Sequence, residues 1–162
     1  MKTELLGIYL NDHLAGATVG TELARRVAGG GQKTADGEGL RRLADDIGND
    51  RRTLLRIMAA LEIPVRRYKV SAAWIGEKAG RLKLNGRLVN RSPLSDLEEL
   101  ELLRLGVEGK AAGWRTLREL AGSDGRLDAD RLDELISRAR DQADRLEELR
   151  VRAANRLIEA HS

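Results

Sequence analysis

Five side chains of this sequence are candidates for binding a metal ion, and each falls on or beside the apolar face of a predicted helix. They are His13, Asp46, Asp50, Glu101 and Glu108. Because the chain has no Cys and only two His, a transition-metal site would depend mainly on carboxylates. Imidazole and carboxylate ligands together suit iron or manganese. One interpretation is therefore a mononuclear or atypical dinuclear site made by these residues.

The same side chains also allow an interpretation without any cofactor. On a helical wheel His13 lies between Leu10 and Ala17, and Asp50 lies between Ile47 and Leu54. A buried charge without a partner is costly, so these groups must be paired if they are inside. The second interpretation is an interior network of His13, Asp50 and an arginine. A third is that some of these groups face solvent, with the helical phase shifted by one position.

A cluster of basic residues between Val65 and Ser92 is the second candidate binding feature. It holds one acidic residue, Glu77, and eight basic residues. The basic residues are Arg66, Arg67, Lys69, Lys78, Arg81, Lys83, Arg87 and Arg91. Such a cluster could attract nucleic acid, an anionic lipid surface or an acidic partner. The alternative is that these side chains cover the acidic ends of neighbouring helices. Both interpretations stay open at this point.

The sequence offers no recognisable catalytic motif. The glycine-rich segment 29–34 lacks the spacing of a phosphate-binding loop and follows a predicted helix rather than a strand. Neither His has a recognisable serine partner for nucleophilic catalysis. We therefore name no catalytic residue, and we favour a non-enzymatic protein.

The elements that position these groups are predicted to be four long helices in one domain, residues 1–162. Leu and Ala dominate the apolar residues, Phe is absent, and aromatic residues make up 2% of the chain, a composition that favours an all-α fold. Apolar periodicity places the helices at 3–28, 36–62, 93–121 and 128–160.

Local signals define the ends and faces of these helices. Pro64 is expected to stop the second helix, and Ser92 followed by Pro93 to start the third, with Ser95 to Glu98 as an alternative capping box. In the first helix Asn11 falls on the polar side. In the third helix three glycines share a face, Gly106, Gly109 and Gly113. Glycine disfavours helix, so we expect close approach there of a neighbouring helix or a second subunit, which makes a homodimer one alternative.

The connections predict the order of the helices in space. Short turns join helices one to two and three to four, so each pair should be an antiparallel hairpin. The long crossover 63–92 can run the length of the bundle and set helix three parallel to helix two. It contains a short amphipathic stretch with Val70, Trp74 and Ile75, expected to be an extra helix, and an Asn-Gly turn at 85–86 that forms a small hairpin or a plain loop.

Two helical hairpins joined by one long crossover resemble the ferritin-like superfamily of four-helix bundles. The stretches LGIYLNDHLAGATVGTELARRVA and SPLSDLEELELLRLGVEGKAAGW are similar to an uncharacterised bacterial family of ferritin-like proteins. The di-iron members use Glu-x-x-His motifs, but Leu10 precedes His13 and Ile158 precedes His161 at that spacing. The resemblance therefore implies a bundle without the usual di-iron ligands. Our working hypothesis is a non-enzymatic binding or scaffold protein.

The composition indicates the class of protein and its location in the cell. A hydrophobic fraction of 41% and a charged fraction of 34% are typical of a folded, soluble chain. There is no apolar run long enough for a membrane span and no signal-peptide pattern. Without cysteine, the cytoplasm is the default location.

Overall fold

The computed structural model describes residues 2–30, 36–66 and 92–159, which form four α-helices and no strand. The helices are α1 (Lys2–Gly30), α2 (Gly37–Ala60), α4 (Pro93–Leu120) and α5 (Ala129–Glu159). The prediction of an all-α fold with four long helices is confirmed, and every end lies within two residues of its predicted position. The expected crossover helix and the hairpin or loop at 83–88 lie outside the described residues.

Side-chain caps explain where α4 and α5 begin. The Ser95 backbone N–H donates to Ser92 Oγ at 3.2 Å, and Pro93 fills the first helical position. This confirms the start at Ser92 rather than the alternative at Ser95. The Asp128 carboxylate plays the same part for α5, since it accepts from the Arg131 backbone N–H at 3.0 Å.

The end of α2 is a left-handed turn that precedes Pro64. Glu62 has a φ of 57°, and it is the only non-glycine residue with positive φ in the described part of the chain. The Ile63 N–H bonds to the Met58 carbonyl at 2.8 Å, and the Glu62 N–H bonds to the Ala59 carbonyl at 3.0 Å. This pair of bonds is a Schellman motif. It ends the helix before the proline can, so Pro64 follows the stop rather than causing it.

We expect Glu62→Gly to raise the free energy of unfolding by about 0.5–1 kcal/mol, because glycine adopts positive φ without a Cβ clash but gains entropy when unfolded. Urea denaturation measures the change. Glu62→Ala is the matched control, since it removes the same charge but keeps the strained Cβ. An equal gain in both variants would mean that charge, not backbone strain, limits stability here.

Interactions between the hairpins fix how the helices pack. Between α1 and α4, the Tyr9 hydroxyl donates to Thr116 Oγ1 at 3.0 Å, and Arg26 Nε lies 2.8 Å from Glu99 Oε1. The N-terminal part of α1 therefore meets the C-terminal part of α4, so these two helices are antiparallel.

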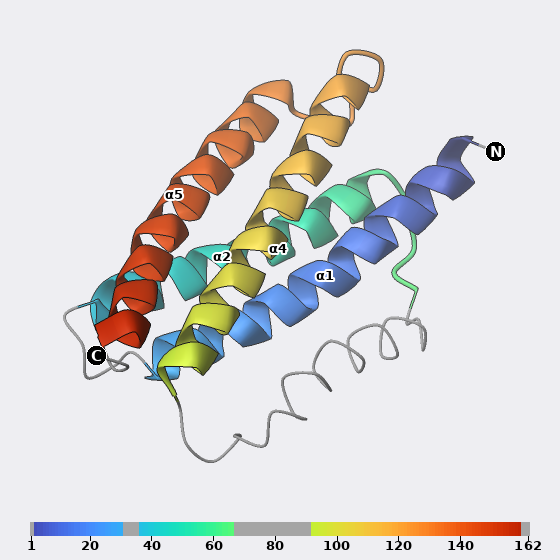
Figure 1. Cartoon of the computed structure of the whole chain (residues 1–162). Coiled ribbons are helices and arrows are strands. Elements are labelled where there is room, and N and C mark those ends of the chain that lie inside the picture. The colour runs from blue at the N-terminus through green and yellow to red at the C-terminus, as the bar shows by residue number, and fades with distance from the viewer. Residues whose placement is uncertain (1, 31–35, 67–91, 160–162) are drawn as a thin grey trace.

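Ion pairs show the same arrangement for α2 and α5. Asp36, at the start of α2, pairs with Arg145 and Arg152, whereas Asp50, further along α2, pairs with Arg138. Each helix is thus antiparallel to its two neighbours, and α2 runs parallel to α4 across the bundle (Figure 1). This is the relative direction that the long crossover predicted.

The core lies along the centre of the bundle and is mostly leucine. The most deeply buried apolar side chains come from all four helices: Leu10, Met58, Leu117, Leu132, Leu135 and Leu146. Trp114 of α4 is also buried, at 2% exposure.

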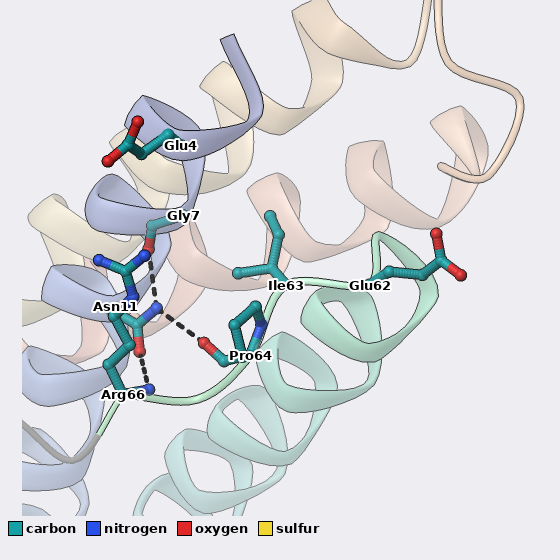
Figure 2. Close-up of a pocket in the computed structure, with 7 residues that line it drawn as sticks. All are labelled: Glu4, Gly7, Asn11, Glu62, Ile63, Pro64 and Arg66. Atoms are coloured by element: carbon teal, nitrogen blue, oxygen red, sulfur yellow. Dashed lines mark hydrogen bonds between the residues drawn. The ribbon is translucent and has the colours of Figure 1, made fainter. Parts of the chain in front are cut away.

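Asn11 is buried, although the apolar periodicity of the sequence predicts it on the polar side of α1. Its exposure is 5%. Its side-chain amide donates to the carbonyls of Gly7, at 2.7 Å, and Pro64, at 3.1 Å, and its oxygen accepts from the Arg66 N–H at 2.6 Å. Figure 2 shows these bonds tying the chain after α2 to α1. A polar residue is stable here because it satisfies the Pro64 carbonyl and the Arg66 N–H, which lie outside the helices.

The three glycines of α4 have different surroundings. A Cβ built at Gly113 would lie 3.1 Å from both Cε1 and Nδ1 of His13, so the expected close approach of a neighbouring helix occurs here. No described atom lies within 4 Å of a Cβ at Gly106 or Gly109. The structure therefore gives those two glycines no neighbouring helix.

We expect Gly106→Ala and Gly109→Ala each to raise the free energy of unfolding by about 1 kcal/mol, the difference in helix propensity. Gly113→Ala should gain less or lose stability, because the His13 ring must move aside. Thermal unfolding of the three variants measures the contrast. A loss of stability in Gly106→Ala or Gly109→Ala would show that something packs on that face in solution.

Candidate functional site

A cluster of charged and polar side chains crosses the middle of the bundle. We call it the Asp50 cluster, and it consists of Asp50, Lys110, Arg138 and Gln142. Asp50 is 1% exposed. Its Oδ2 accepts from Lys110 Nζ at 2.6 Å and from Gln142 Nε2 at 3.1 Å, and its Oδ1 accepts from the Arg138 guanidinium. Lys110 also donates to Gln142 Oε1, so three helices meet at one carboxylate.

The helical repeat brings these groups together. Asp50 lies on the apolar face of α2, as predicted. On α4, Lys110 is spaced three residues after Val107 and four before Trp114, both buried, so it projects from the same face. Arg138 and Gln142 are one turn apart on α5 and reach Asp50 from one side. Sequence reasoning missed Lys110 and Arg138.

Burial decides the electrostatics of the cluster. Burial lowers the pKa of the Lys110 ammonium, and this effect outweighs the attraction of Asp50, which raises the pKa. Asp46, half-buried one turn before Asp50, also favours the charged lysine. The two carboxylates and the two cations balance in formal charge. The arrangement can hold helices together, and three of the acceptor positions of the Asp50 carboxylate are already used by Lys110, Arg138 and Gln142.

His13 lies apart from the Asp50 cluster. Its ring makes an edge contact with Tyr9, with centroids 4.5 Å apart, and lies against Gly113 of α4. No interaction joins it to Asp50 in the described structure. Of the expected network of His13, Asp50 and an arginine, the structure forms the pairing of Asp50 with Arg138.

The five metal candidates do not come together. Glu108 is exposed, and Glu101 is exposed with Arg150 at 3.7 Å. Within residues 2–30, 36–66 and 92–159, no three His, Asp or Glu side chains are grouped so that they could hold a metal ion. Two of the three side chains that bond to Asp50 are the cations Lys110 and Arg138, which do not fit iron or manganese, because these metals need anionic or neutral donors.

We expect the stability of the protein to fall as the pH drops below about 6.5, the ordinary pKa of histidine, partly because of His13. Burial lowers the pKa of His13, and the nearby Asp12 offsets part of this. Between the lowered pKa and the ordinary one the unfolded chain binds more protons, so acid favours unfolding. His13→Gln should flatten this part of the pH profile in urea denaturation. If the pH dependence of stability is the same in His13→Gln as in the unchanged protein, His13 does not cause the loss of stability in acid.

The basic cluster of the crossover can be placed at one residue only. Arg66 is described, with its backbone N–H bound to Asn11. The other seven basic residues, Arg67, Lys69, Lys78, Arg81, Lys83, Arg87 and Arg91, lie outside the described residues.

Two small hollows accompany the helices. One, of about 170 Å³, surrounds Asn11 between α1 and the end of α2, with Glu4 and Glu62 at its rim (Figure 2). The side-chain amide and carbonyl of Asn11 are already bonded to backbone groups. Asn11 therefore does not single out this hollow as a ligand site. The other, of about 210 Å³, lies between α1 and α2 and is lined by arginines.

Comparison with known proteins gives no relative. No protein-family model matches the chain, and no curated protein or solved structure is significantly similar to it. None of the described helices has the length and apolar character that crossing a membrane requires.

Proposed function

We propose that this protein is a non-catalytic bundle of ferritin-like architecture that acts as a binding or scaffold protein. The observation that carries the proposal is the Asp50 cluster. Ferritin-like enzymes bind metal through side chains in the core of the bundle, and the buried carboxylate in the core of this bundle pairs with Lys110 and Arg138 instead. Two cations beside a carboxylate repel a metal ion and occupy acceptor positions that would bind it.

The direction of the helices supports the ferritin-like part of the proposal. Two antiparallel hairpins with α2 parallel to α4 require one connection that spans the bundle, and ferritin-like folds have one such crossover. The ion pairs of Asp36 and Asp50 with α5 define this direction independently of the crossover itself.

Metal analysis tests the proposal. The protein is purified after growth with added iron and manganese, and its metal content is measured by mass spectrometry. We expect far less than one metal ion per chain. A stoichiometric metal that is lost in His13→Ala, and kept in the exposed control variant Glu4→Ala, would overturn the proposal in favour of a His and carboxylate site.

A further inference from the structure

The hollow between α1 and α2 is lined by more arginines than carboxylates. It is lined by Thr18, Thr21, Glu22, Arg25, Arg51 and Arg52, and we call it the arginine groove. It holds three guanidinium groups against one carboxylate. Glu22 pairs with Arg25 at 2.8 Å, so that charge is already neutralised.

Within the described residues, Arg51 and Arg52 have no carboxylate partner. Arg51 Nε donates to Thr18 Oγ1 at 2.9 Å, which holds the guanidinium at the groove, and no described acceptor bonds to its two terminal nitrogens. Arg52 donates to the side-chain oxygen of Asn49. One turn later Arg56 bonds only to Thr53 Oγ1, at 2.9 Å. The C-terminal half of α2 therefore presents a positive surface without acids.

Most arginines of α5 show a contrast. Arg131, Arg138, Arg145 and Arg150 each pair with a carboxylate, so they have a structural use, whereas Arg140 and Arg156 are exposed and have no carboxylate partner within the described residues. Three guanidinium groups against one carboxylate give the groove a net positive charge, which favours the binding of an anion.

We infer that the arginine groove binds a phosphate group, either of a small phosphorylated molecule or of a nucleic-acid backbone. Guanidinium groups bind phosphate through paired N–H donors. A phosphate group has several oxygen atoms, so it can accept hydrogen bonds from Arg51 and Arg52 together. A volume of about 210 Å³ suits one or two phosphate groups and is below that of a pocket for a drug-sized ligand. The hydroxyls of Thr18 and Thr21 donate to backbone carbonyls, so the arginines supply the donors.

Titration of the full chain with two probes tests the inference. Pyrophosphate binding is measured by calorimetry at low salt, and binding of a short labelled single-stranded oligonucleotide by fluorescence anisotropy. The test variant is Arg51→Gln with Arg52→Gln. The control is Arg140→Gln with Arg156→Gln on α5, which removes the same charge from two exposed arginines without carboxylate partners. Circular dichroism and thermal unfolding confirm that each variant is folded.

We expect the test variant to weaken binding of at least one probe by about tenfold, the effect of losing one or two charge-assisted hydrogen bonds. The control should stay within about twofold of the unchanged protein. Weaker pyrophosphate binding identifies a site for small phosphorylated molecules, and an effect on the oligonucleotide alone identifies a nucleic-acid backbone. The variant Arg51→Lys with Arg52→Lys keeps the positive charges but loses the paired N–H donors of the guanidinium groups. It should bind the probe with an affinity between those of the unchanged protein and the test variant.

The inference is overturned if the unchanged protein binds neither probe, or if test and control variants lose affinity equally. It rests on the proposed function only in treating the chain as a binding protein. Metal content reports on the bundle interior and phosphate affinity on the α1–α2 surface, so failure of one is distinguishable from failure of the other.

Discussion

Asp50→Ala should lower the free energy of unfolding by about 3–5 kcal/mol, the loss typical when one partner of a buried ion pair is removed. The variant leaves Lys110 and the Arg138 guanidinium without their carboxylate in the middle of the bundle, where Lys110 is 14% exposed and Arg138 is 31% exposed. Urea denaturation followed by circular dichroism measures the change.

Asp45→Ala is the matched control for Asp50→Ala. Asp45 is exposed on the same helix, so the variant has the same change in charge and helix propensity, and it should shift stability by less than about 0.5 kcal/mol. A loss below about 1 kcal/mol in Asp50→Ala would contradict the importance of the Asp50 cluster. A quadruple variant, Asp50→Leu with Lys110→Met, Arg138→Met and Gln142→Leu, should recover most of the lost stability, because apolar groups of similar volume can replace a buried ion pair and no buried amide is left without a partner.

Leu146→Ala should lower the free energy of unfolding by about 3 kcal/mol, as is common for a fully buried leucine. Leu146 is 0% exposed and lies one turn after Gln142 on α5, so the cavity would open beside the Asp50 cluster. Urea denaturation again measures the loss.

Val151→Ala on the same helix is the control for Leu146→Ala, because Val151 is 42% exposed. It should cost less than about 0.5 kcal/mol. If both variants lose the same stability, the face of α5 that carries Leu146 is not the buried face.

The helices could be predicted from sequence because their signals are local. The Ser92 side chain caps α4 with bonds inside one turn, and Asp128 does the same for α5, so residue types at fixed spacing were sufficient. The end of α2 was predicted near the correct residue for a different reason. Glu62 adopts a left-handed conformation that its residue type does not favour, and packing of Ile63 in the core stabilises it.

The candidate site was predictable only in part. Asp50 was placed correctly by its apolar neighbours. Lys110 does not stand out in the sequence because lysine is mostly exposed in proteins, although its spacing from Val107 and Trp114 marks the buried face. Asn11 was missed because its partners, Pro64 and Arg66, are distant in sequence, and no local pattern encodes such a contact. The position of His13 depends on Gly113 across the bundle for the same reason.

The Asp50 cluster divides its charges between the two hairpins. The acid belongs to α1–α2, and the cations and the amide belong to α4–α5. Two copies of the α4–α5 hairpin packed on each other would bring four cations together, and two copies of α1–α2 would bring two acids together with no cation between them. The charges of the cluster therefore favour packing of one hairpin on the other over packing of either hairpin on a second copy of itself. The cluster favours correct assembly of the two hairpins as well as their stability once packed.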